Sequence, residues 1–195
     1  MGYHRAGFEV VGVDIKPQPR YPFEFHQADA MTFPLDGFDV IHASPPCQAY
    51  SNAQKIRGRS HPDLIAPLRA RIRAEAPGVP YVIENVQGAP LIAPTLLCGL
   101  MFPGLRVYRH RLFECDPFYF DEPHIGYGHP YEVAKMGRPP RPGQFMHVVG
   151  NFSDVRAARE AMGIDWMTRD ELREAIPPAY TEYIGARLMA ALVPA

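Results

Sequence analysis

The chain has 195 residues, a length that suits one domain with one substantial core. Its formal net charge of −1 argues against a basic nucleic-acid-binding tail and against an acidic solvating tail. No apolar run approaches the roughly 18 residues of a membrane span, and no signal peptide precedes the first expected strand. With three cysteines that cannot all pair, we expect a reduced, cytoplasmic protein with no membrane partner.

The first segment predicts the second half of a β-α-β unit. Residues 1–6 are typical of the last turns of a helix, with Gly7 as its left-handed stop, and residues 8–13 predict a buried strand. Asp14 ends that strand, where nucleotide-binding α/β folds place an acid that binds ribose hydroxyls. A turn-forming or helix-capping aspartate explains Asp14 equally well.

A proline-rich stretch reaches the most distinctive loop of the sequence. Residues 25–30 predict a short strand with Asp29 at its end, and residues 38–43 predict a buried strand. Two prolines end that strand and place Cys47 in a stiff loop at its carboxyl end, the rim where open α/β sheets bind ligands. Cys47 is therefore either an aimed nucleophile or a small buried apolar side chain.

The segment after this loop is basic. Residues 51–62 carry Lys55, Arg57 and Arg59 and no acid before Pro62, which predicts either a mobile phosphate-contacting loop or a solvated face. Residues 64–76 predict an amphipathic helix.

Further polar residues come with the next expected strands. Residues 81–83 predict a buried strand that ends at Glu84, which could face Cys47 and stay protonated in a dry site, or could be a solvated capping residue. Residues 107–114 alternate like an edge strand with Arg109 and Arg111 on one face, which suits an anion, a polar base edge or plain surface.

The remainder predicts an irregular segment followed by helices. Residues 115–150 show weak periodicity, and we expect an insertion rather than a separate domain. The histidines of this segment lack ligand spacing with the cysteines, so no metal site is expected. Helices are expected over 154–162, 169–175 and 179–192, with Ser153 or Asp154 capping the first and a Thr168–Glu171 capping box on the second.

Several of these motifs resemble those of DNA cytosine-5 methyltransferases, above all the small phage and prophage type. Ser44–Gln48 is similar to the Pro-Cys-Gln signature of that family, and Ile83–Val86 to its Glu-Asn-Val signature. Arg109–Arg111 resembles the paired-arginine motif and follows in the same order.

The resemblance extends to the two ends of the chain. Val11–Asp14 and Gln27–Asp29 are similar to the second and third cofactor motifs of the family. Ile176–Tyr180 with Gly185 resembles the last motif, whose helix packs back on the cofactor site.

The resemblance implies an α/β, Rossmann-like S-adenosylmethionine-dependent methyltransferase fold that lacks the family's first strand and Gly-rich turn. That strand would lie between the strand ending at Asp14 and the strand preceding Cys47, so we expect two unpaired strand edges. We also expect that the true start of the protein lies upstream or that the sequence is a fragment. The cofactor-binding residues implied are Asp14, Ile15, Asp29, Ala30 and Pro45.

The resemblance also implies a reaction. The Cys47 thiolate would add to C6 of a flipped cytosine, Glu84 would protonate or hydrogen-bond N3, Arg111 would hold the base carbonyl, and Arg109 would assist near C6. The partner implied is double-stranded DNA, and a restriction endonuclease is a conceivable second partner of an expected monomer. The implied DNA contacts are Gln48, Ser51, Lys55, Arg57 and Arg59.

The expected layout is a catalytic core over 1–114, a target-recognition insertion over 115–150 and core-completing helices over 151–195. Two alternatives stay open. One is a non-catalytic DNA-binding homologue, and the other is a cysteine-dependent enzyme acting on a free pyrimidine nucleotide, which shares the addition to C6.

Overall fold

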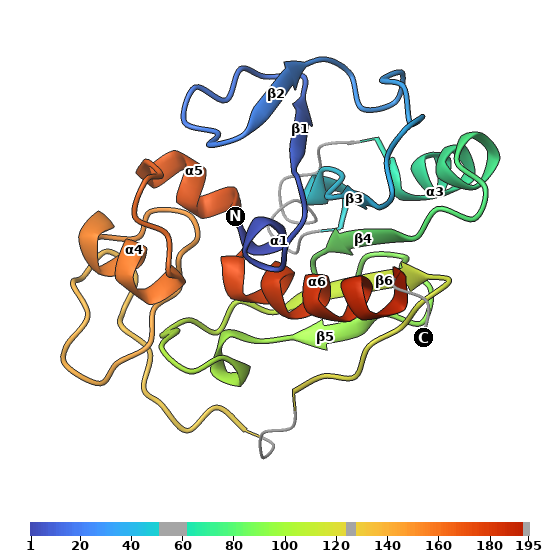
Figure 1. Cartoon of the computed structure of the whole chain (residues 1–195). Helices are drawn as coiled ribbons and strands as arrows, with labels where there is room; N and C mark the ends of the chain where they lie inside the picture. Colours follow the sequence, from blue (N-terminus) through green and yellow to red (C-terminus); the bar gives the residue numbers. More distant parts are fainter. Residues whose placement is uncertain (51–61, 124–127, 193–195) are drawn as a thin grey trace.

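The computed structural model describes residues 1–50, 62–123 and 128–192 and has a mixed α/β architecture, as expected (Figure 1). The strands are β1 Val11–Asp14, β2 Glu24–Gln27, β3 Ile41–Ala43, β4 Tyr81–Asn85, β5 Thr95–Leu97 and β6 Arg111–Asp116. The α-helices are α1 Gly2–Arg5, α3 Ile65–Glu75, α4 Val155–Met162, α5 Arg169–Glu174 and α6 Pro178–Leu192, and short 3-10 helices are η1 Cys47–Ala49 and η2 Gly99–Met101. Within the described ranges, no helix has both the length and the apolar character needed to cross a membrane.

The strands form two separate sheets. β1 and β2 make a parallel pair, and the other four strands make a sheet in the order β3-β4-β6-β5. In the part of the chain that the structure describes, β1 and β3 are not hydrogen-bonded to each other. Each of these two strands is thus an edge strand of its own sheet among the described residues, which is compatible with the unpaired edges expected from the sequence.

The four-stranded sheet is mixed. β3 and β4 are parallel, whereas β6 is antiparallel to both of its neighbours, β4 and β5. The sequence-based expectation of an edge-like strand over 107–114 is therefore wrong. The strand begins at Arg111 and lies inside the sheet, because the short strand Thr95–Leu97, which the sequence did not reveal, pairs with its outer side.

Helices cover both faces of this sheet. Alternate residues of β4 point to opposite faces, so Val82 packs with Ile184 of α6, whereas Ile83 packs with Ile65 of α3. An ion pair of 2.6 Å between Arg69 and the buried Glu114 also ties α3 to β6. The carboxyl end of β4 is thus held between two packed helices.

The contact between α1 and α6 depends on two glycines. A Cβ at Gly2 would lie 2.1 Å from the carbonyl oxygen of Pro178, and a Cβ at Gly185 would lie 2.7 Å from the Cβ of Ala6. Neither position could carry a side chain without moving one helix away from the other.

The segment after β6 packs onto the core rather than forming a unit of its own. β6 continues through Asp116, two residues into the expected insertion. Later in that segment, Met146 forms a bridge with Val107, and Val133 forms one with Phe145. Met146 and Val148 are buried in a cluster with α4, so this irregular stretch supplies core residues.

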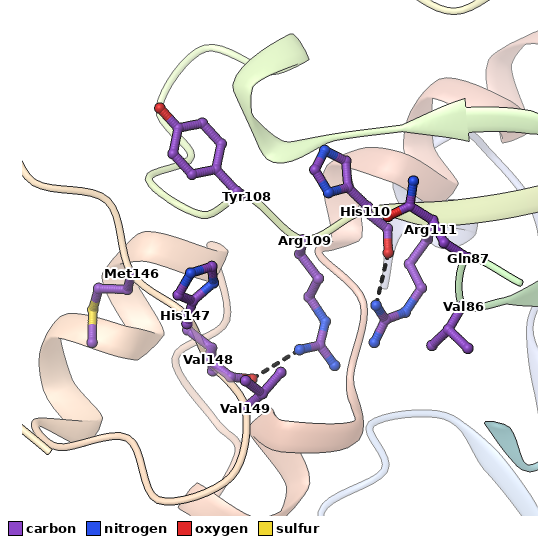
Figure 2. A pocket seen from close by; sticks show the side chains of 10 residues that line it. All are labelled: Val86, Gln87, Tyr108, Arg109, His110, Arg111, Met146, His147, Val148 and Val149. Atoms are coloured by element: carbon purple, nitrogen blue, oxygen red, sulfur yellow. Dashed lines mark hydrogen bonds between the residues drawn. The ribbon is translucent and has the colours of Figure 1, made fainter. Parts of the chain in front are cut away.

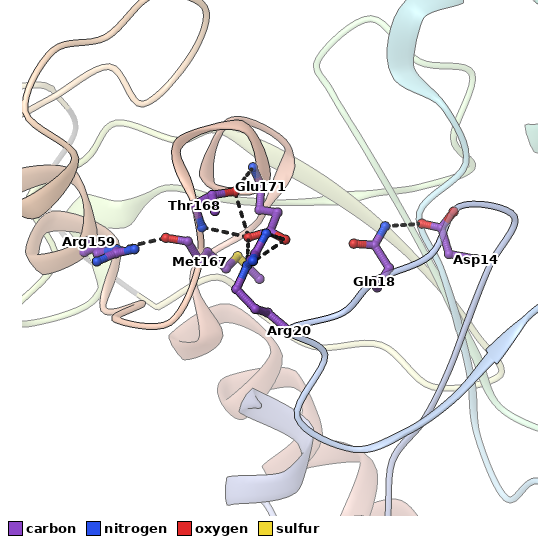
Figure 3. A network of polar contacts seen from close by, with 7 residues as sticks. All are labelled: Asp14, Gln18, Arg20, Arg159, Met167, Thr168 and Glu171. Atoms are coloured by element: carbon purple, nitrogen blue, oxygen red, sulfur yellow. Dashed lines mark hydrogen bonds and ion pairs between the residues drawn. The ribbon is translucent and has the colours of Figure 1, made fainter.

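Side-chain caps determine where α4 and α5 begin. The Asp154 carboxylate accepts a hydrogen bond from the Ala157 amide, and Thr168 and Glu171 form the expected capping box. Glu171 also pairs with Arg20, at 2.8 Å, and so joins α5 to the β1–β2 connection (Figure 3).

The Glu171→Gln variant is expected to lower the thermal midpoint at neutral pH. The hydrogen bond from Arg20 holds the pKa of Glu171 down to about 2, below its ordinary value of 4.5. Its stabilising effect is therefore present above pH 4.5 and lost as the pH falls through about 2. We expect a loss of about 1 kcal/mol at pH 7 and a smaller difference from wild type at pH 2, measured by thermal unfolding at both pH values. An equal difference at both would contradict this.

Candidate functional site

The loop that carries Cys47 is fixed to the end of β4. Ala43 of β3 pairs with Ile83, so the chain leaves β3 beside Glu84. The Asn85 side-chain amide then donates a hydrogen bond of 2.9 Å to the carbonyl oxygen of Pro45. Cys47 follows as the first residue of η1 and is half-buried, a position accessible to a ligand.

Glu84 is a buried carboxyl group at the carboxyl end of β4, with 7 % of its surface exposed. Its Oε1 lies 2.8 Å from Nε of Arg111, which is also largely buried. Burial raises the pKa of Glu84, and the charge of Arg111 opposes that rise only in part. Glu84 is therefore suited to gaining a proton if Arg111 turns to another partner.

Arg109 is buried just before β6 and has no carboxylate partner among the described residues. It donates hydrogen bonds to the carbonyl oxygens of Val148, at 2.8 Å, and Arg173, at 2.6 Å, and its Nε has no partner in the described structure. Burial and, to a smaller extent, the charge of Arg111 lower the pKa of Arg109 to about 9, and the charge of Glu84 acts on it in the opposite sense. It stays cationic at neutral pH.

A cavity of about 540 Å³ lies against the two arginines, a size that suits a small ligand. Figure 2 shows the Arg109 and Arg111 side chains pointing the same way, which agrees with the expectation that they share a face. The residues that line the cavity are Val86, Gln87, Tyr108, Arg109, His110, Arg111, Met146, His147, Val148 and Val149. The wall formed by 146–149 comes from the expected target-recognition segment.

The acids expected at the cofactor site lie at the carboxyl ends of the β1–β2 pair. Asp14 accepts a hydrogen bond of 2.8 Å from the Lys16 amide. It accepts another of 3.0 Å from the Gln18 side chain (Figure 3). Asp29 likewise accepts from the Met31 amide, at 2.8 Å. Both acids form turns, which for Asp14 is the alternative that the sequence left open, but each keeps unused acceptor capacity.

Some of the other residues expected to contact cofactor or DNA are exposed, and the rest lie outside the described residues. The Ile15 side chain is 68 % exposed beside Asp14, and Ala30 and Gln48 are exposed. Ser51, Lys55, Arg57 and Arg59 lie outside the described residues.

A half-buried histidine, His42, also supports the Cys47 loop, and the sequence did not reveal it. The Tyr3 hydroxyl lies 2.7 Å from Nδ1 of His42, and Nε2 of His42 lies 3.1 Å from Oγ of Ser44. Burial lowers the pKa of His42 to about 4, so the ring is neutral at pH 7. His42 sits inside the expected strand 38–43, where its polar role depends on Tyr3, 39 residues away.

The Asn85→Ala variant is expected to loosen the Cys47 loop. It removes the donor to the Pro45 carbonyl and the acceptor for the Val86 amide, at a cost of about 1–3 kcal/mol. Thermal unfolding should show the loss, and the Cys47 thiol should react faster with a small disulfide reagent under native conditions. Unchanged stability and thiol reactivity would show that Asn85 does not hold the loop.

No protein-family model matches the chain, and no curated protein matches it. The site has a thiol on a fixed loop and a buried carboxyl group paired with Arg111. The guanidinium groups of Arg109 and Arg111 line the cavity, whereas Cys47 and Glu84 are not among its lining residues. Such a set can add a nucleophile to an electron-poor ring and stabilise the charge that develops.

Proposed function

We propose that this protein is an S-adenosylmethionine-dependent DNA cytosine-5 methyltransferase with the Rossmann-like fold of that class. The observation that carries the proposal is the buried Glu84–Arg111 pair at the carboxyl end of β4, directly beside the loop that presents Cys47. A nucleophile, a proton donor and a carbonyl-binding cation are the three groups that activation of cytosine C5 requires.

The chain's own residues perform the activation of the base. The Cys47 sulfur, as a thiolate, forms a bond to C6, and the electrons of the C5–C6 double bond move toward C5. Glu84 donates its proton to N3, which keeps negative charge from building up on the ring. After C5 has gained its substituent, the C5 proton passes to water, and the C5–C6 double bond re-forms as the Cys47–C6 bond breaks to release the thiolate. The N3 proton returns to Glu84.

Entry of the base changes the partner of Arg111. In the free protein its guanidinium pairs with Glu84. When it binds the cytosine carbonyl oxygen, Glu84 loses part of the charge that lowers its pKa, and burial then favours the protonated carboxyl group. Binding of the pyrimidine itself thus prepares the proton donor.

The residues at the ends of β1 and β2 fit the adenosine part of S-adenosylmethionine. Asp14 keeps free acceptor positions for ribose hydroxyls, and the exposed Ile15 side chain offers an apolar surface for the adenine ring. When bound, the cofactor supplies an electrophilic methyl group to C5. Asp29 and Ala30 would border the same site, and Pro45 would border it from the Cys47 loop.

The experiment is a transfer assay with a labelled methyl group. Duplex DNA that contains cytosine should take up label at C5. Free deoxycytidine monophosphate should not, because it lacks the strand contacts that hold a flipped base in the site. Label on the free nucleotide alone would favour a nucleotide enzyme, and DNA binding without any transfer would favour a non-catalytic module.

A further inference from the structure

Three side chains from separate segments converge beside the cavity. They are Cys98 after β5, His110 before β6, and His129 in the segment between β6 and α4. The Cys98 sulfur lies 3.7 Å from Nε2 of His129, and Nε2 of His110 lies 3.1 Å from the same atom. All three ligand atoms lie within 4.8 Å of one another.

The two distances at His129, 3.7 and 3.1 Å, are close to those between ligands on one tetrahedral ion. Bond lengths of about 2.3 Å for zinc–sulfur and 2.0–2.1 Å for zinc–nitrogen place such ligand atoms roughly 3.3–3.6 Å apart. Two imidazole nitrogens 3.1 Å apart also repel each other as lone pairs unless a proton or a cation lies between them. We propose that Cys98, His110 and His129 bind a zinc ion.

The third ligand, His129, is exposed but is held in place by aromatic stacking. Its ring stacks on Tyr108 with centroids 4.1 Å apart, and Tyr108 stacks in turn on Phe145 at 4.5 Å. The Tyr108 hydroxyl donates to the carbonyl oxygen of Tyr131 and accepts from its amide. These contacts orient the ligand before the ion binds, as supporting residues do at metal sites.

The positions of the three ligands suit an ion that joins separate chain segments beside the cavity. Cys98 is buried, His110 is half-buried and His129 is exposed, so the cluster extends from the interior to the surface. Tyr108 and His110 also line the cavity beside Arg109 and Arg111 (Figure 2). The ion would join three chain segments and fix this wall of the cavity. His147 lines the same cavity without belonging to the cluster.

The test measures metal binding by the full chain, independently of any transfer activity. Protein stripped with a chelator is titrated with Zn²⁺ in competition with a chromophoric chelator, and with Co²⁺ to record its absorption spectrum. We expect one ion per chain and a thiolate-to-cobalt charge-transfer band. Cys98→Ser should remove that band, and His129→Ala should weaken zinc binding by roughly 100-fold or more.

Matched variants separate this site from others. Cys115→Ser and His147→Ala should each keep zinc affinity within about threefold of wild type and keep the band. Zinc should raise the thermal midpoint of wild type but not of His129→Ala, which also shows whether that variant is folded. Absence of stoichiometric binding, a band that survives Cys98→Ser, or equal loss in His147→Ala would overturn the proposal.

Discussion

Cys47→Ser is expected to abolish methyl transfer, with a fall on the order of 10⁴-fold or more. A serine hydroxyl at this position is un-ionised at neutral pH and adds poorly to C6, while the hydrogen bond between Asn85 and Pro45 that fixes the loop is unchanged. The measurement is the single-turnover rate of label transfer to duplex DNA at saturating cofactor.

The control for this variant is binding. Cys47→Ser should keep its affinity for DNA within about threefold, because the two arginines and the cavity wall are untouched. Cys115→Ser, which alters a free thiol within β6, should keep the wild-type transfer rate. A Cys47→Ser protein that transfers methyl groups within about tenfold of wild type would exclude Cys47 as the nucleophile.

Glu84→Gln is the second variant with a large expected effect. The glutamine keeps the size of the side chain and can donate a hydrogen bond, but it cannot deliver a proton to N3, so we expect transfer to slow by about 10²–10⁴-fold. The loss should appear in the rate of the chemical step more than in the affinity for DNA.

The pH dependence tests the protonation state. Because burial raises the pKa of Glu84, the wild-type rate should fall as the pH rises through that raised value, where the carboxyl group loses its proton. Glu84→Gln should lack this fall. Glu182→Gln, at an exposed pair with Arg5, is the matched control and should keep both the rate and the profile. Identical pH profiles for wild type and Glu84→Gln would contradict a role for Glu84 as the proton donor.

Local chemistry explains which parts of the fold were predictable. The capping box of Thr168 and Glu171 depends only on residues three positions apart. The buried strand β4 could be predicted from its run of apolar side chains. The three-residue strand β5 lacks such a signal, because Thr95–Leu97 becomes a strand only by pairing with β6. The position of β6 inside the sheet follows from that pairing and was therefore missed.

The candidate site shows the same division. The motif residues Cys47, Glu84 and Arg111 could be found in the sequence, and the structure brings Glu84 and Arg111 into contact beside the Cys47 loop. The carbonyl partners of Arg109 could not be found, since they lie 39 and 64 residues away. The cluster of Cys98, His110 and His129 was missed because the three residues lie in separate segments and their spacing does not match a metal-binding sequence motif.

In the proposed reaction, Cys47 forms a covalent bond to C6 of a cytosine in DNA. Duplex DNA with 5-fluorocytosine tests it directly, because fluorine at C5 replaces the proton that must leave before the thiolate can be released. With S-adenosylmethionine present, we predict a stable protein–DNA adduct that mass spectrometry of the digested complex assigns to Cys47. No adduct, or an adduct at Cys98 or Cys115, would contradict this account.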